Sequence, residues 1–418
     1  MHTIFIQIAS YRDPELVPTV LDCIANAKYP ESLHFCIGWQ HDGTEDISKI
    51  KDLPNVRILD VPHTKTKGAC WIRSKIQQYY DDETYTLQLD SHHRFDKDWD
   101  QTLIDMYETL KLTGVNKPIL STYLPSYQVN NDPAGRLYEP WQVNFDRFLP
   151  EGVIFLRPST LRNWQQLSLP APARGFSAHF IFTQGRWCLD VPYDPDLYFH
   201  GEEISLAVRS FTHGYDLYHP HKVVIWHHYT REGFKKHWDD HTNWNNLNLL
   251  SYKRVKILLG VDGEDYDQIN FGAYGLGNKR TLHEFEIYAG VDFKTRRFHK
   301  DCIKEETPPI KYTGVETFES GLASWTKHCI DIYKPDVSEM DYDFWCIVFK
   351  NNDNKDLYRQ DASKEDINNL FGQDRNDKFL HIWREFYCDE RATKWVLWPH
   401  SVSKGWEHKI IEGTINYA

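Results

Sequence analysis

The amino-terminal part of the chain alternates between short β-rich runs and segments with helical periodicity. We expect strands at residues 3–9, 33–39, 56–61, 85–90 and 119–123, and helices at residues 16–24, 68–80 and 103–110. The first run is apolar and β-branched without strict alternation, as in a strand that is covered on both faces. Because strands that alternate with helices are typical of a parallel sheet, the sequence predicts an α/β fold of the Rossmann-like kind.

The sequence pattern changes in the carboxy-terminal part of the chain. The chain has 418 residues, which is more than one hydrophobic core usually organises. A Pro-Pro pair at 308–309 marks a break, and residues 344–349 and 395–398 read as strands of a small antiparallel module. We therefore predict two domains, a catalytic one at residues 1–310 and an accessory β-rich one at residues 311–418.

Charge and cysteine usage exclude several classes of protein. The formal net charge is -12 and no long block of Lys or Arg interrupts it, so we expect no nucleic-acid partner. The eight cysteines form no CxxC pair, which argues against a zinc knuckle or a disulfide scaffold and favours reduced thiols in a cytoplasmic protein. We expect no secretion signal and no transmembrane segment, because no apolar run approaches the roughly 20 residues that cross a bilayer.

One β-rich run ends abruptly in Asp90-Ser91-His92. A carboxylate and an imidazole two residues apart, where a strand gives way to a loop, are suitable ligands for a divalent metal ion. His228, which follows a later predicted strand, is the candidate third ligand, and His227 is its competitor. A loop that caps the next helix would explain Asp90 and His92 equally well.

Other charged residues are expected at the same edge of the sheet. Arg12 and Asp13 follow the first strand, Asp42 follows the second, and Gly68 and Arg73 precede the fourth. Each taken singly is explained by capping, turn formation or a solvated helix face. Together they line the place where a nucleotide would lie, with Asp42 accepting from uracil or ribose hydroxyls and with Arg12 and Arg73 near base or phosphate.

Glu202 and Glu203 open a predicted helix after Gly201. Carboxylates in a first helical turn are stabilised by the helix dipole, which is a sufficient explanation by itself. At the rim of a cleft the same groups could hold an acceptor hydroxyl or act as a base. Residues 125–174, where the pattern loosens, are expected to form either an acceptor cleft or lid, or a peripheral excursion.

These motifs together resemble a known family. The resemblance lies in residues 67–73, 89–92, 199–209 and 226–231 and extends over about residues 1–295. In these runs the chain resembles the GlcNAc-transferase family (glycosyltransferase family sixty), which includes cytosolic enzymes that attach GlcNAc to hydroxyproline of an F-box adaptor protein. The order and spacing are also similar to those of the polypeptide GalNAc-transferases, whose Asp-x-His motif and later His bind manganese in a GT-A fold.

The resemblance implies a GT-A nucleotide-sugar transferase domain followed by a mainly β module. It assigns the metal ligands to Asp90, His92 and His228, with His227 as the alternative, and the sites beside donor sugar and acceptor to Glu202 or Glu203. It assigns the nucleotide contacts to Arg12, Asp42 and Arg73, and we group Asp13, Gly68 and Ser91 with them. It further implies retention of the anomeric configuration, by a front-face reaction in which the leaving diphosphate takes the acceptor proton.

We therefore expect a glycosyltransferase that moves a sugar, GlcNAc in the first instance, from UDP-GlcNAc or a related nucleotide-sugar to a hydroxyl group of a protein or glycan. The expected cofactor is Mn²⁺, with Mg²⁺ as the second choice. One alternative is a carbohydrate-binding or scaffold protein on a degenerate transferase fold. Another is a histidine-rich metal hydrolase.

Overall fold

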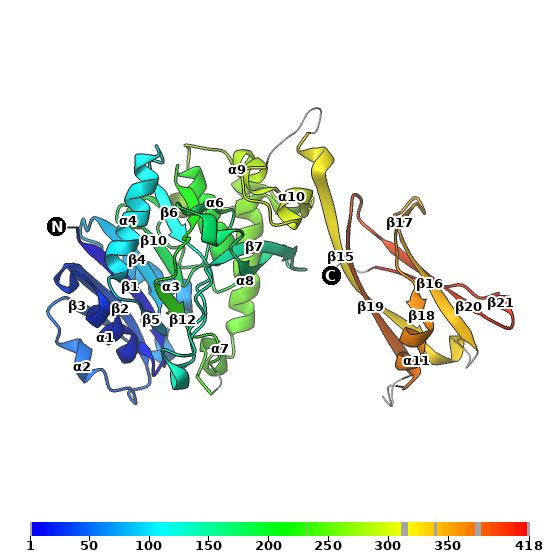
Figure 1. The fold of residues 1–418 in the computed structure, drawn as a ribbon, viewed down its shortest axis with the longest axis horizontal. Coiled ribbons are helices and arrows are strands. Elements are labelled where there is room, and N and C mark those ends of the chain that lie inside the picture. The colour runs from blue at the N-terminus through cyan, green and yellow to red at the C-terminus, as the bar shows by residue number, and fades with distance from the viewer. Residues whose placement is uncertain (1, 232, 311–316, 338–340, 373–377, 416–418) are drawn as a thin grey trace. The chain divides into compact units, whose positions relative to one another are not determined.

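The computed structural model describes residues 2–231, 233–310, 317–337, 341–372 and 378–415 (Figure 1). The chain divides into two compact units, of which the first is Met1–Thr295 with Asp301–Thr313 and the second is Arg296–Lys300 with Gly314–Ala418. The predicted boundary between residues 310 and 311 adjoins residues 311–316, which lie outside the described residues. The predicted domain limits therefore stay a prediction.

The first unit is built on a mixed eight-stranded sheet with the order β3-β2-β1-β4-β10-β6-β11-β9. The strands are β1 (Ile4–Tyr11), β2 (Leu33–His41), β3 (Val56–Pro62), β4 (Tyr85–Asp90), β6 (Pro118–Ser121), β9 (Ala171–Pro172), β10 (Phe180–Gln184) and β11 (Asp216–His219). The first four predicted strands pair in parallel, so the predicted α/β class is confirmed. Strand β10 runs antiparallel between β4 and β6, an insertion that the alternating pattern did not predict.

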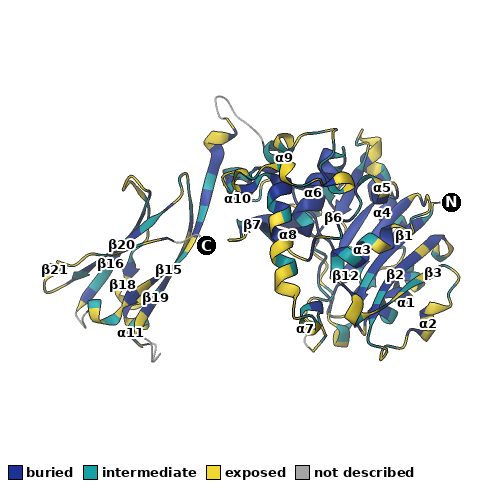
Figure 2. Ribbon diagram, turned by 180° about the vertical axis from the view of Figure 1, so that it is seen from behind, coloured by how far each residue is buried: buried dark blue, intermediate teal, exposed yellow. Residues whose placement is uncertain are grey.

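Helices cover this sheet, and shorter strands surround it. The helices are α1 (Leu16–Asn26), α2 (Ser48–Lys51), α3 (Ala69–Gln77), α4 (Trp99–Leu112), α5 (Trp187–Asp190), α6 (Glu202–Thr212), α7 (His237–Asp240), α8 (Trp244–Leu259), α9 (Leu282–Ala289) and α10 (Lys300–Ile303). The shorter strands are β5 (His93–Phe95), β7 (Trp141–Phe148), β8 (Ile154–Thr160), β12 (Ile225–His227) and β13 (Val291–Asp292). The central strands are largely buried (Figure 2), and Val20 of α1 and Leu103 of α4 belong to the same hydrophobic core as Ile6 of β1 and Leu87 of β4.

The second unit is mainly β, as predicted. It contains β14 (Arg297–His299), β15 (Leu322–Tyr333), β16 (Tyr342–Lys350), β17 (Asp356–Arg359), β18 (Ala362–Ser363), β19 (Phe379–Cys388), β20 (Lys394–Ser401), β21 (Gly405–Trp406), β22 (Ile411–Thr414) and the helix α11 (Lys364–Gly372). Its strands pair antiparallel, and the predicted strands at 344–349 and 395–398 lie inside β16 and β20. A separate core, which includes Ile330, Trp345 and Leu397, holds this unit together.

The helices and the cysteines of the described residues bear on two of the predictions from sequence. No helix within the described ranges is both long and apolar enough to cross a membrane. All eight cysteines have free thiols.

The burial of Leu87 at the centre of the sheet predicts that truncating this side chain destabilises the protein. Leu87 is fully buried in β4, between Ile6 of β1 and Phe182 of β10. Leu87→Ala should lower the free energy of unfolding by about 2–5 kcal/mol, because the cavity cannot collapse between two paired strands. Urea unfolding followed by circular dichroism measures the loss.

The matched control is Leu112→Ala at the end of α4, where the leucine is 88% exposed. This change should stay within about 0.5 kcal/mol of the parent. Equal losses for the two leucines would contradict the central position of β4.

Candidate active site

A cleft of about 590 Å³ opens at the carboxyl ends of β1 and β4. Asp90, Ser91 and His92, at the turn from β4 into β5, contribute to its lining. Other parts of the lining come from residues 201–204 at the start of α6, residues 235–238 around α7 and residues 154–156 of β8, and from His227, Tyr229 and Arg231 at and after the end of β12. In an open α/β sheet, ligands bind at this edge, where strands end and loops begin.

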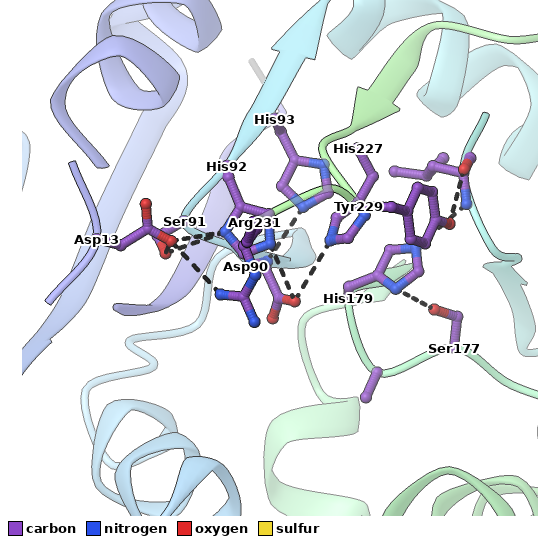
Figure 3. A network of polar contacts seen from close by, with 12 residues as sticks. Asp13, Asp90, Ser91, His92, His93, Ser177, His179, His227, Tyr229 and Arg231 are labelled. Atoms are coloured by element: carbon purple, nitrogen blue, oxygen red, sulfur yellow. Dashed lines mark hydrogen bonds and ion pairs between the residues drawn. The ribbon is translucent and has the colours of Figure 1, made fainter. Parts of the chain in front are cut away.

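Three ligand groups converge in the cleft (Figure 3). Asp90 Oδ2 lies 3.8 Å from His92 Nε2 and 3.6 Å from His227 Nε2, and the three ligand atoms all lie within 4.8 Å of one another. Although His227 is buried, neither of its ring nitrogens has a hydrogen-bond partner within the described part of the chain. A buried imidazole without a partner is costly unless a ligand satisfies it. One carboxylate and two imidazoles therefore fit a divalent metal ion.

His227 rather than His228 joins this group. His227 ends β12 and directs Nε2 toward Asp90, whereas the backbone N–H of His228 bonds to the carbonyl oxygen of His92 at 3.1 Å. The ring of His228 turns toward Tyr127, whose carbonyl oxygen lies 3.5 Å from His228 Nδ1. The sequence predicts His228 as the third ligand, whereas the structure brings His227 to Asp90 and His92.

Asp13 and Ser91 lie behind His92. His92 Nδ1 donates to Asp13 Oδ2 at 2.7 Å, and the Ser91 hydroxyl donates to the same oxygen at 2.8 Å. Burial favours the protonated form of Asp13, but the hydrogen bond and charge of His92, together with hydrogen bonds from the Glu15 N–H and Ser91, lower the pKa of this carboxyl. A carboxylate on the far nitrogen fixes the tautomer of a ligating histidine, so Nε2 of His92 is presented to Asp90. The sequence groups Asp13 and Ser91 with the nucleotide contacts, and that assignment stays a prediction.

The guanidinium of Arg73 forms ion pairs with two carboxylates that line the cleft. Its NH2 lies 2.6 Å from Asp90 Oδ1, and its NH1 pairs with Glu202 Oε1. Arg73 is only 4% exposed. Burial would raise the pKa of Asp90, but His227 and the charge of Arg73 lower it well below its usual range. Arg73, which was expected to contact the nucleotide, lines the cleft with both terminal nitrogens already bonded to carboxylates.

Arg12 and Asp42 lie in a neighbouring hollow of about 390 Å³, which Asp13 also lines. Arg12 pairs with Asp42 through NH2 and with Asp240 through NH1, the latter at 2.7 Å. Lys235 lines both this hollow and the cleft, so the two spaces adjoin. The structure therefore divides the predicted nucleotide set between two neighbouring spaces.

Two glycines permit close contacts at the cleft. Gly68, immediately before α3, has a φ of +110°, and a Cβ there would lie 3.0 Å from the ring of Tyr198. Gly201, before α6, has a φ of +93°, and a Cβ there would lie 2.8 Å from Val255. Any other side chain at either position would strain the backbone and displace its neighbour.

Glu202 and Glu203 are adjacent but differently bound. Glu202 is buried and committed to Arg73. Glu203 lines the cleft, where its Oε1 accepts from the Ala178 N–H at 2.9 Å and its Oε2 accepts from the Tyr123 hydroxyl at 2.7 Å. Burial raises the pKa of Glu203 to about 7. Glu203 can therefore exchange a proton near neutral pH.

Several cleft residues were not identified from the sequence. His179 has partners on both ring nitrogens, as expected of a core histidine, yet its ring also stacks on His227 with 4.2 Å between centroids. Tyr123, Lys235 and Lys236 also line the cleft. No local spacing marks these side chains, because distant parts of the chain bring them together.

Comparison with known proteins gives a family match. The family described as "Glycosyltransferase (GlcNAc)" matches residues 3–54 and 47–295. No curated protein matches the chain by sequence.

Solved structures show distant likenesses. GalNAc-T7 with UDP, GalNAc and Mn²⁺ is 13% identical with a TM-score of 0.47, covering 68% of this chain and 54% of that chain. S. aureus TarS is 11% identical with a TM-score of 0.36, covering 99% of this chain and 77% of that one. Its fragment 1–349 in complex with UDP-GlcNAc is 13% identical with a TM-score of 0.35, covering 61% and 66%. The chain thus spans about half the length of the GalNAc-T7 structure, and likenesses this distant assign no ligand to it.

The Arg73 bridge makes a prediction about stability. Arg73→Met should lower the free energy of unfolding at pH 7 by about 3–5 kcal/mol, because it leaves the carboxylates of Asp90 and Glu202 uncompensated. Denaturant unfolding in metal-free buffer measures this loss. Arg186→Met is the matched control, since the Arg186 side chain is 66% exposed and its ion pair with Asp190 should contribute less than about 1 kcal/mol. Similar losses in the two variants would contradict a buried bridge.

The raised pKa of Glu203 predicts how the stability of the folded state depends on pH. The folded chain holds the proton of Glu203 up to about pH 7, whereas an unfolded chain loses it near the ordinary value of 4.5. The folded state therefore binds more protons between these pH values, and the stability that this proton contributes is lost as the pH rises through that window. Glu203→Gln should remove this part of the pH dependence.

Urea unfolding of both proteins at pH 5 and pH 7.5, without metal, tests this expectation. The difference in stability between Glu203→Gln and the parent should shift in favour of the variant at the higher pH. A difference that stays constant would argue that Glu203 titrates as an ordinary carboxylate.

Proposed function

The chain belongs to the GlcNAc glycosyltransferase family, and from that premise we propose that it transfers GlcNAc from UDP-GlcNAc to a hydroxyl group of a protein or glycan. We further propose that Asp90, His92 and His227 hold a divalent metal ion, Mn²⁺ in the first instance and Mg²⁺ in the second. The observation that carries the proposal is the buried, unpartnered imidazole of His227 beside the carboxylate that also faces His92. The cleft around this group is within the usual size range of a small-molecule site.

The protein supplies a prearranged set of ligands. Arg73 occupies Oδ1 of Asp90 and leaves Oδ2 toward the histidines, while Asp13 fixes the orientation of His92. A bound divalent ion would act as a Lewis acid for the departing diphosphate. Lys235 and Lys236 line the same cleft and add positive charge for the phosphate groups.

The acceptor side of the reaction involves Glu203 in this proposal. Glu202 also lines the cleft, but its Oε1 is paired with Arg73. Glu203 lies in the cleft with its pKa raised by burial to about 7, so it can exchange hydrogen bonds with an acceptor hydroxyl. Transfer with retention, in which a diphosphate oxygen takes the acceptor proton, needs no protein nucleophile. Both the acceptor and a cytoplasmic location stay predictions.

The pair His227 and His228 gives the sharpest test. His227→Gln should abolish the enhancement of UDP binding by Mn²⁺ and lower kcat/KM for UDP-GlcNAc turnover by at least about 100-fold, because it removes a proposed ligand. His228→Gln, one residue away but facing Tyr127, should retain both within about threefold. Calorimetry with UDP, with and without Mn²⁺, and release of UDP from UDP-GlcNAc provide the two measurements.

Asp90→Asn and His92→Gln should behave as His227→Gln does. Circular dichroism establishes that each variant is folded. Undiminished turnover in these variants, or UDP binding that is indifferent to Mn²⁺ in the parent, would overturn the proposal. Loss of function in His228→Gln alone would instead return the third ligand position to His228.

A further inference from the structure

A second group of metal-ligating side chains lies in the carboxy-terminal unit, on β15 and β19. These strands are antiparallel neighbours (Figure 1), and Asp331 of β15 is directly opposite His381 of β19. Cys329 is two residues before Asp331, so the two side chains leave the same face of the strand. Ile330 and Ile332, which alternate with them, are fully buried on the other face. The three polar side chains therefore share the outer face of the sheet.

Their donor atoms converge on one carboxylate. Asp331 Oδ1 lies 2.8 Å from His381 Nδ1 and 3.5 Å from Cys329 Sγ. One ligand atom from each of the three residues lies within 4.8 Å of the other two. Sulfur, nitrogen and oxygen donors thus meet without any change in the pairing of the strands.

The set of donors indicates the metal. Mg²⁺ and Ca²⁺ prefer oxygen ligands, whereas a thiolate with an imidazole and a carboxylate is typical of Zn²⁺. We propose that Cys329, Asp331 and His381 bind Zn²⁺, with water completing the coordination. The site differs in kind from the Asp90 group, which offers no sulfur.

The scaffold favours binding over an incidental surface contact. The register of β15 and β19 is continuous from Ser324 opposite Cys388 to Tyr333 opposite Phe379, so the ligands project from a fixed ladder. The side chain of Asp331 is 60% exposed, which gives an ion access from solvent. A bound Zn²⁺ would join the two strands at their outer face. This proposal does not depend on the function proposed for the first unit.

Cobalt provides a direct test, because Co²⁺ takes Zn²⁺ sites and its thiolate complexes have a strong charge-transfer absorption. Titration of the full-length, metal-free, reduced protein with Co²⁺ should give a saturable thiolate band that Zn²⁺ then removes. Cys329→Ser should abolish the band. Asp331→Asn and His381→Gln should weaken Co²⁺ binding by at least about tenfold.

Two variants serve as controls. Cys388→Ser removes another partly exposed cysteine of β19, whose Sγ contacts the Glu390 carbonyl, and should keep the band. His227→Gln should also keep it, which separates this site from the Asp90 group. The exposed indole of Trp383, opposite Cys329, gives a second readout, since its fluorescence should change on Co²⁺ binding in the parent but not in Cys329→Ser. A band that is missing in the parent, or that survives in Cys329→Ser, would overturn the proposal.

Discussion

The buried guanidinium of Arg73 is the interaction on which the candidate site depends. It connects α3 with the end of β4 through Asp90 and with the start of α6 through Glu202. A buried charge is tolerated only when it is paired and hydrogen-bonded, so all three elements must be in place before the arginine can be dehydrated. The same contact gives the two oxygens of the Asp90 carboxylate different roles. Oδ1 is bound to Arg73, and Oδ2 faces His92 and His227. Folding of the unit and alignment of the site are therefore coupled.

Much of this arrangement could be predicted from local sequence. The alternation of strands and helices predicts the α/β class, and the abrupt end of the run at Asp90-Ser91-His92 predicts two of the converging groups. Both predictions succeed because they depend on periodicity and on the rule that ligands bind where strands end. The strands of the second unit could be predicted from sequence periodicity as well.

The remainder depends on contacts between distant parts of the chain. His227 and His228 are adjacent, yet the fold turns His227 toward Asp90 and His228 toward Tyr127. The hydrogen bond from His92 to Asp13 joins residues 79 positions apart, so no spacing along the chain reveals it. Arg12 lies in a neighbouring hollow rather than in the cleft, because its guanidinium is paired there with Asp42 and Asp240. Long-range packing and ion pairing, which local patterns do not encode, account for these differences.

The position of β10 has a consequence for synthesis on the ribosome. Strand β4 carries Asp90 at its end and needs β1 on one side and β10 on the other. The first neighbour is made before β4, but the second emerges only after β5 to β9 have been translated. During that interval the nascent chain presents β4 as an open edge, able to pair with foreign strands. Vectorial synthesis therefore leaves the strand beneath the cleft without its second neighbour until β10 is made, and that strand needs protection until then.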